Sequence, residues 1–264
     1  MVWTMTPAKV PGFTAELIFS LFLVSLYTTI YNNREIESML SFALFIVLCY
    51  VVGSFPTSIL LGKVAKGIDI RNYGSGNAGG TNVIRLLGWQ AGVSVILFDI
   101  LKGYIATMLV PKLLYGPLPF PNATPFEDIT VIRIIAGCAA ILGHVWTAFG
   151  GFRGGKGMAT AGGVLLGLAT IEALVALGVF AIAFIIWRYV SLGSISAAIA
   201  FPLAMLVRHN IFHAELQGYH TLIFVSIGIS VLLLYTHRAN IRRLIAGTEH
   251  RLSRIHLGKH NSQK

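Results

Sequence analysis

Long apolar runs constrain this chain more than any other feature of its sequence. Seven of them come close to the roughly 20 residues that an α-helix needs to cross the hydrocarbon core of a bilayer. They cover about residues 41–62, 90–110, 129–149, 158–171, 173–187, 190–207 and 219–236. Charged residues make up only 11% of the chain, whereas soluble domains contain about 25%. We therefore predict an all-α, polytopic integral membrane protein with seven transmembrane helices, and exclude a disordered or disulfide-built secreted chain.

The fourth and fifth segments belong to one apolar run, 158–187, which only Glu172 and Gly178 interrupt. We place a hairpin at Glu172, because this division brings the basic loops to one side of the membrane. That side contains the loops 63–88 and 150–157, Arg188 and the tail from His237, with 14 of the 20 lysines and arginines. The positive-inside rule predicts that it is cytoplasmic. The net charge of +10 thus orients the chain and does not indicate a nucleic-acid partner.

The first 40 residues precede the first clear span. Their apolar part, 16–31, has no signal-peptide cleavage site. Three interpretations stay open: an eighth span, an interfacial helix, or an extension read from an upstream start, with Met39 as the true initiator. We favour a peripheral or dispensable role. The predicted organisation is an N-terminal extension over 1–40, one seven-span domain over 41–255 and a flexible cytoplasmic tail over 256–264.

The first cytoplasmic loop has the composition of an anion-binding site. Residues 74–85 read GSGNAGGTNVIR, which combines glycines with Ser, Thr, Asn and Arg donors. Glycines let the backbone approach a phosphate closely, and the donors replace its water shell. The pattern also contains GxGxxG, but no strand precedes it, so we reject a dinucleotide site. Asp99, at the position of the expected ribose ligand, lies inside the second span, where we expect it to pair with Lys102.

The second cytoplasmic loop, GGFRGGKGMAT over 150–160, nearly matches a Walker A motif. Gly157 occupies the position that needs Ser or Thr for magnesium, so we reject that interpretation. A glycine-rich turn with Lys156 just before a helix N-terminus still attracts phosphate, through free N–H groups and the helix dipole.

Two further polar segments lie on the same side. Ser191 and Ser194 follow the fifth span, and their hydroxyls either cap the next helix or bind a ligand. His237 and Asn240 share one helical face at i, i+3 after the last span. His144, near the cytoplasmic end of the third span, is either a packing residue or part of the site. Together these residues predict a site rich in phosphate donors and poor in acids, with no metal-ligand set.

Five motifs together resemble a known family. They are GSGNAGGTNVIR, FDILKG, GGFRGGKGMAT, SLGS and HRANIRRLIAGTEHR, in this order within about residues 41–255. The chain resembles the PlsY-type acyl-phosphate:glycerol-3-phosphate acyltransferases of bacteria. The departures are Gly80, where alanine is usual, and the stretch from His144 to Thr147, which lacks a common proline.

The resemblance implies an enzyme of phospholipid biosynthesis in the bacterial inner membrane, with its C-terminus and its active-site loops in the cytoplasm. Such an enzyme transfers a fatty acyl chain from acyl phosphate to the 1-hydroxyl of glycerol 3-phosphate and releases lysophosphatidic acid and phosphate. It implies no cofactor and no metal. The expected partners are the two substrates, membrane lipid and the enzyme that forms acyl phosphate, with no nucleic acid.

The resemblance also assigns roles motif by motif. The catalytic residues are Ser75, His237 and Asn240. The acyl-phosphate site is expected to contain Ser75, Gly76, Asn77, Gly79, Thr81, Asn82 and Ser194. The glycerol 3-phosphate site is expected to contain Arg85, Lys156, Gly154, Gly155, Gly157 and Ser191.

Two other functions stay open on the sequence. Basic loops near a membrane face also serve a transporter for an anionic phosphorylated solute, and a basic tail also serves a lipid-binding scaffold. A transporter predicts polar residues at the bilayer midplane, but the chain has little there beyond Asp99 and Lys102. A scaffold leaves the two glycine-rich loops without a role. We therefore favour the acyltransferase.

Overall fold

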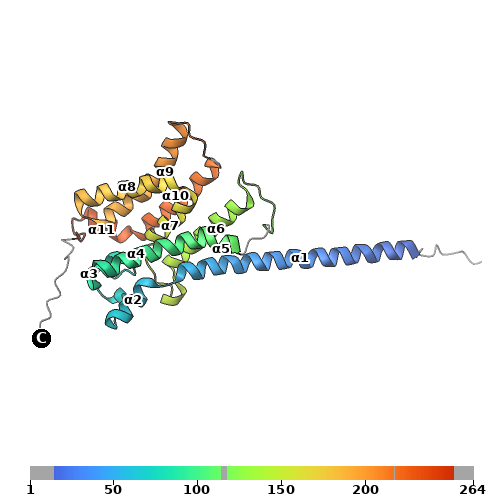
Figure 1. The fold of residues 1–264 in the computed structure, drawn as a ribbon, viewed down its shortest axis with the longest axis horizontal. Helices are drawn as coiled ribbons and strands as arrows, with labels where there is room; N and C mark the ends of the chain where they lie inside the picture. The colour runs from blue at the N-terminus through green and yellow to red at the C-terminus, as the bar shows by residue number, and fades with distance from the viewer. Residues whose placement is uncertain (1–14, 114–117, 217, 253–264) are drawn as a thin grey trace, which may run out of the picture.

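The computed structural model describes residues 15–113, 118–216 and 218–252, and these residues form helices joined by loops (Figure 1). The α-helices are α1 (Ala15–Ser54), α2 (Thr57–Lys66), α3 (Gly80–Leu87), α4 (Trp89–Tyr104), α5 (Val110–Leu113), α6 (Asp128–Val145), α7 (Met158–Leu168), α8 (Thr170–Trp187), α9 (Val190–Asn210), α10 (Tyr219–Thr236) and α11 (Arg238–Ile245). Short 3-10 turns form at Ile70–Asn72 (η1) and Ala148–Gly150 (η3), and a π-turn, η2 (Ile105–Leu109), joins α4 to α5. The predicted all-α class is confirmed.

Within the described ranges, six helical segments are long and apolar enough to cross a membrane. They are Glu35–Lys66, Trp89–Lys112, Asp128–Gly150, Thr170–Trp187, Val190–Asn210 and Tyr219–Thr236. The remaining apolar helix, α7, has only 11 residues and is about 17 Å long at 1.5 Å per residue. Six of the seven predicted spans are therefore candidate spans in the structure, and the fourth, predicted over 158–171, is the shorter helix α7.

The break between α7 and α8 falls at Ala169, three residues before the predicted hairpin at Glu172. Ala169 leaves the helical conformation, with φ −149° and ψ 71°. Glu172 instead lies in the first turn of α8, where a carboxylate is stabilised by the helix dipole. Its side chain is buried and pairs with Arg208 of α9 at 2.6 Å. Glu172 therefore marks the start of a helix and not the turn before it.

The first apolar segment is also divided differently from the prediction. Helix α1 has 40 residues and runs without a break across the expected boundary at residue 40. It ends at Ser54, just before Pro56, because proline disfavours helical geometry in the residue that precedes it. A second helix, α2, then covers the rest of the expected span. The N-terminal part of α1 projects beyond the end of the bundle (Figure 1).

Helix α1 packs along α6, and α4 packs along α7, at glycine contacts. A side chain at Gly143 would meet the backbone of Tyr50 and Ser54 in α1, and one at Gly163 would meet the backbone of Ile100 in α4. Lipid tails are as apolar as the helices, so close packing of small residues is a main source of helix association in a membrane. Glycine occupies these positions because the two backbones touch.

The cytoplasmic segments of the prediction gather at one end of the bundle. Helices α2, α3 and α11 lie at this end, opposite the projecting part of α1 (Figure 1). The loop before α7 and the start of α9 contribute residues to the same cavity as α3 and α11. The break between α7 and α8 makes this possible, because it returns the chain to the same end. The polar motifs of the sequence therefore converge.

The substitution Gly143→Ala tests the contact between α1 and α6. It is expected to lower stability by about 1–3 kcal/mol, because the added methyl group must displace the α1 backbone. Gly178→Ala in α8 is the matched control, since nothing lies within 4 Å of a Cβ there. The control is expected either to leave the stability unchanged or to raise it by about 0.5–1 kcal/mol. Thermal unfolding of both variants in detergent micelles measures the difference, and equal midpoints would contradict the contact.

Candidate active site

A cavity of about 300 Å³ lies where the polar motifs meet. Its mouth is polar, and its inner part continues between α7, α8, α9 and α10 among apolar side chains. Twelve of the predicted site residues line it: Ser75, Asn77, Gly79, Thr81, Asn82, Arg85, Lys156, Gly157, Ser191, Ser194, His237 and Asn240. The other three, Gly76, Gly154 and Gly155, are not among its lining residues.

The shape of the first loop depends on Asn82, which is almost fully buried. Its side-chain amide donates to the carbonyl oxygens of Ile70 at 2.9 Å and Tyr73 at 3.1 Å. Its Oδ1 accepts from the backbone N–H of Ser75 at 2.9 Å. Gly74, with φ +60°, lies against the same oxygen, where a Cβ would clash. Both N–H groups of the Asn82 amide are therefore used to position the loop that carries Ser75.

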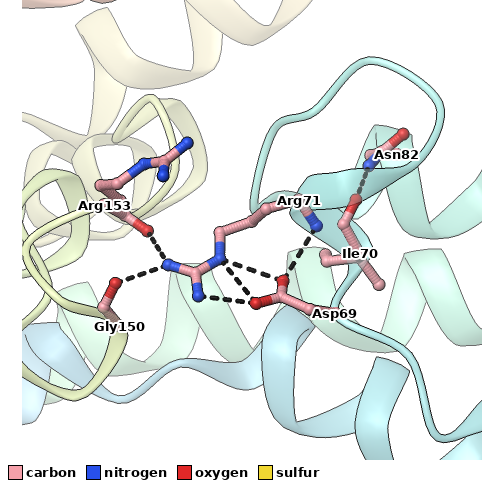
Figure 2. A network of polar contacts seen from close by, with 6 residues as sticks. All are labelled: Asp69, Ile70, Arg71, Asn82, Gly150 and Arg153. Atoms are coloured by element: carbon pink, nitrogen blue, oxygen red, sulfur yellow. Dashed lines mark hydrogen bonds and ion pairs between the residues drawn. The ribbon is translucent and has the colours of Figure 1, made fainter.

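Arg71 ties the first loop to the second (Figure 2). Its Nη1 donates to the carbonyl oxygens of Gly150 at 2.5 Å and Arg153 at 3.0 Å. Its Nε and Nη2 donate to the Asp69 carboxylate at 3.0 and 2.7 Å. These hydrogen bonds lower the pKa of Asp69 to about 2, so the carboxylate stays charged at neutral pH. Arg71 and Asp69, which do not line the cavity, thereby fix the position of the two glycine-rich loops relative to each other.

Gly154 and Gly155 attach the second loop to the end of α6. Their N–H groups donate to the carbonyl oxygens of Val145 at 3.0 Å and His144 at 3.1 Å, which lie in the last turn of a helix and lack helical partners. A side chain on Gly155 would also collide with the His144 ring. The expectation of free N–H groups is therefore not met at these two glycines, whose amides are already paired.

The free helix N-terminus that the second loop was expected to provide belongs to α7. Gly157, with φ +84°, turns the chain into this helix, and its left-handed conformation favours glycine. Met158 and Ala159, the first residues of α7, line the cavity beside Lys156. The unpaired N–H groups of a first helical turn and the helix dipole both attract an anion.

His144 joins a buried ion pair to the cavity. Asp99 Oδ1 lies 2.8 Å from Lys102 Nζ and 3.6 Å from His144 Nδ1, which confirms the expected pairing of Asp99 with Lys102. Lys102 also donates to the carbonyl oxygen of Phe55 at 3.0 Å, just after α1 ends. Asp99 and His144 both line the cavity. The site therefore contains a carboxylate next to an imidazole, an arrangement that the spacing of these residues in the sequence does not reveal.

A chain of hydrogen bonds links the second loop, α11 and α9. Lys156 Nζ donates to Asn240 Oδ1, and Asn240 Nδ2 donates to Glu249 Oε1 at 2.7 Å. The same carboxylate accepts from Ser191 Oγ at 2.8 Å and from Arg243 Nε at 2.6 Å. We did not predict Glu249 as a site residue. The available signal was its place within the motif HRANIRRLIAGTEHR, twelve residues after His237.

The cavity concentrates positive charge in a poorly solvated place. Burial, together with the nearby cations Arg243 and Arg85, lowers the pKa of Lys156 to about 8, although the charge of Glu249 raises it. Burial and then the charge of Lys156 lower the pKa of His237 to about 4, so this imidazole is neutral at pH 7. Burial also lowers the pKa of Arg85. A bound anion would relieve this mutual repulsion.

The donor set of the cavity fits phosphate groups. Two half-buried cations, Arg85 and Lys156, surround one space together with the start of α7 and the serines Ser75, Ser191 and Ser194. Charge-assisted hydrogen bonds of this kind are the strong ones. In the described part of the chain, no three His, Cys, Asp or Glu side chains come close enough together to ligate a metal ion.

The substitution Arg71→Lys tests whether Arg71 holds the two loops together. Lysine keeps the charge but cannot bridge a carboxylate and two carbonyl oxygens at once. Because Arg71 is partly exposed, we expect a loss of about 1–2 kcal/mol, seen as a lower midpoint of thermal unfolding in micelles. Arg153→Lys is the control, since only the backbone oxygen of Arg153 takes part in the network. An unchanged midpoint for Arg71→Lys would contradict this role.

Comparison with known proteins places these features in a family. Residues 43–247 match the family described as glycerol-3-phosphate acyltransferase. The glycerol-3-phosphate acyltransferase of Chlorobaculum tepidum is 49% identical over 231 residues, which cover 81% of this chain and 98% of the relative. The corresponding enzyme of Chlorobium phaeobacteroides is 45% identical over 242 residues, which cover 84% of this chain and 100% of the relative.

Two solved structures are also similar to this chain. Both are crystal structures of PlsY, described as an integral membrane glycerol 3-phosphate acyltransferase, one in the glycerol 3-phosphate form and one in the lysophosphatidic acid form. Each is 37% identical to this chain, with TM-scores of 0.68 and 0.65, and the matches cover 81% and 80% of this chain and 96% and 95% of those chains. The chain is a member of the PlsY family of integral membrane glycerol-3-phosphate acyltransferases.

Proposed function

We propose that this enzyme takes its acyl group from acyl phosphate and gives lysophosphatidic acid and inorganic phosphate as products. The observation that carries this proposal is the two-part cavity. Its phosphate donors lie at the mouth, and its apolar inner part continues between the helices. The family resemblance supports acyl phosphate as the donor, because it extends through all five motifs. The glycerol 3-phosphate and lysophosphatidic acid forms of the related crystal structures support the acceptor and the product.

The two phosphate groups are assigned to different parts of the mouth. The first loop, with Ser75 and its neighbours, and Ser194 hold the phosphoryl group of the donor. Arg85, Lys156 and the start of α7 bind the phosphate of glycerol 3-phosphate, and Ser191 supports them through Glu249. The paired amides of Gly154 and Gly155 give these glycines a supporting role, since they fix the loop that carries Lys156.

His237 and Asn240 orient the attacking hydroxyl. His237 Nδ1 lies 2.8 Å from the carbonyl oxygen of Leu233, so the neutral ring carries its proton on Nδ1 and presents Nε2 as an acceptor. Because its pKa is about 4, this imidazole is a weak base. Phosphate oxygens titrate near pH 6 and are stronger bases. The proton of the hydroxyl therefore goes to the donor's own phosphate.

The reaction is a direct transfer. The 1-hydroxyl oxygen of glycerol 3-phosphate attacks the acyl carbonyl carbon and forms the new ester bond. The bond between that carbon and the bridging phosphate oxygen breaks, and phosphate leaves with the hydroxyl proton. Acyl phosphate is an activated donor, so proximity and electrostatic stabilisation by the mouth supply much of the acceleration. No cofactor enters this step.

In the membrane, we propose that the mouth faces the cytoplasm and that α7 is a short seventh crossing. The basic loops that gather at the mouth support this orientation. The localisation is then the bacterial inner membrane, with the C-terminus in the cytoplasm. Residues 1–40 stay peripheral in this proposal, and the enzyme that forms acyl phosphate is a candidate partner at the same face.

A release assay tests the proposed reaction. The purified enzyme, given acyl phosphate and glycerol 3-phosphate without any other cofactor, is expected to release inorganic phosphate and form lysophosphatidic acid. Asn240→Ala and Lys156→Ala are expected to lower the rate by at least about 100-fold, because each removes a group that contacts substrate and also leaves its hydrogen-bond partner unpaired. Arg242→Ala, on the exposed face of α11, is the control and keeps the rate. Turnover with acyl-CoA but none with acyl phosphate would reject the donor.

The pH dependence of kcat/KM for glycerol 3-phosphate tests the role of Lys156. Its ammonium group is protonated below a pKa of about 8 and neutral above it. Since kcat/KM reports ionisations of the free enzyme, it is expected to fall as the pH rises through about 8. Lys156→Arg stays charged and is expected to lose this alkaline limb at whatever rate it retains. If the wild-type protein and Lys156→Arg show the same alkaline limb, the ionisation belongs to a group other than Lys156.

A further inference from the structure

The inner part of the cavity, which we call the inner chamber, is a space lined by apolar side chains. It is lined by Leu165 of α7, Ala173 and Ala176 of α8, and Ala197 and Phe201 of α9. The serine hydroxyls of α9 belong to the mouth. Along α9, Phe201 lies ten residues beyond Ser191, which corresponds to about 15 Å. The chamber therefore extends from the phosphate site deep into the helical bundle.

Phe201 forms the inner end of this chamber. It is the deepest residue of α9 that lines the cavity, and only 3% of its surface is exposed. Met205, one turn further along α9, packs with Tyr219 and Ile223 in the same core cluster but does not line the cavity. Beyond Phe201 the space between the helices is thus filled by side chains.

The width of the inner chamber comes from alanines. Ala173, Ala176 and Ala197 are all buried, lie in one core cluster with Phe201 and line the cavity. A larger side chain at any of these positions would occupy the space between α8 and α9. Packed apolar interiors respond to changes of a single methylene, so the end and the width of such a chamber discriminate between chains of different length.

We propose that Phe201 sets the longest acyl chain that the enzyme accepts, with Ala176 providing the clearance that lets the chain reach it. This inference rests on the proposed use of an acyl phosphate donor. A chain that ends before Phe201 fits in the inner chamber with its phosphate at the mouth. A longer chain has to displace Phe201 or bend, and either change moves its carbonyl carbon away from the attacking hydroxyl.

The experiment compares kcat/KM for dodecanoyl, hexadecanoyl and eicosanoyl phosphate. Phe201→Ala is expected to raise the ratio of eicosanoyl to dodecanoyl activity by at least about tenfold, because it opens space for the additional methylenes. Ala176→Leu is expected to lower the ratio of hexadecanoyl to dodecanoyl activity by a similar factor. Ratios within one variant are independent of how much protein is folded, so a general loss of stability does not mimic either result.

Two matched controls separate chain length from packing. Phe45→Ala removes a buried phenylalanine from the cluster between α1 and α6, and Ala183→Leu enlarges a buried alanine of α8 that does not line the cavity. Both are expected to keep the wild-type ratios. Unchanged ratios in Phe201→Ala and Ala176→Leu would overturn the inference and show that the chain leaves between the helices into lipid. If the wild-type protein uses no acyl phosphate of any length, the proposed donor fails instead.

Discussion

The hydrogen bonds that run from Lys156 through Asn240 to Glu249 hold the polar end of this molecule together. The three residues come from the second loop, from α11 and from the segment after it. Burying any of them without a partner is unfavourable, because an unpaired charge or amide in a poorly solvated place costs several kcal/mol. Once paired, they line one side of the cavity. Ser191 joins them and attaches α9 to the same carboxylate.

The bilayer limits how such a site can be built. Segments within hydrocarbon have to satisfy their backbone polar groups as helices, so irregular loops that bind anions are confined to the ends. Close glycine contacts at Gly143 and Gly163 bring α1, α6, α4 and α7 together. Arg71 and Asn82 then fix the two glycine-rich loops at one end. The resulting cavity is polar at one end and apolar at the other, which suits a substrate with a phosphate head and an acyl tail.

Much of this arrangement follows from the sequence, because it depends on periodicity, charge and local motifs. The apolar runs predicted the helices, and the distribution of lysine and arginine predicted that four polar segments meet. The pairs formed by distant residues were not predictable in this way. His144 approaches Asp99 only because α6 packs near α4, and Glu249 reaches Asn240 only because the chain turns back after α11. The break was predicted at Glu172 and not at Ala169 because a lone carboxylate in an apolar run resembles a turn residue until its ion pair with Arg208 is known.

The proposed mechanism requires that both substrates occupy one cavity at the same time and that the acyl chain passes directly from one to the other. Initial rates over a grid of acyl phosphate and glycerol 3-phosphate concentrations test it. Reciprocal plots that intersect are expected, because a ternary complex precedes transfer. Parallel plots, together with an acylated protein that accumulates in the absence of glycerol 3-phosphate, would indicate a covalent intermediate and contradict direct transfer.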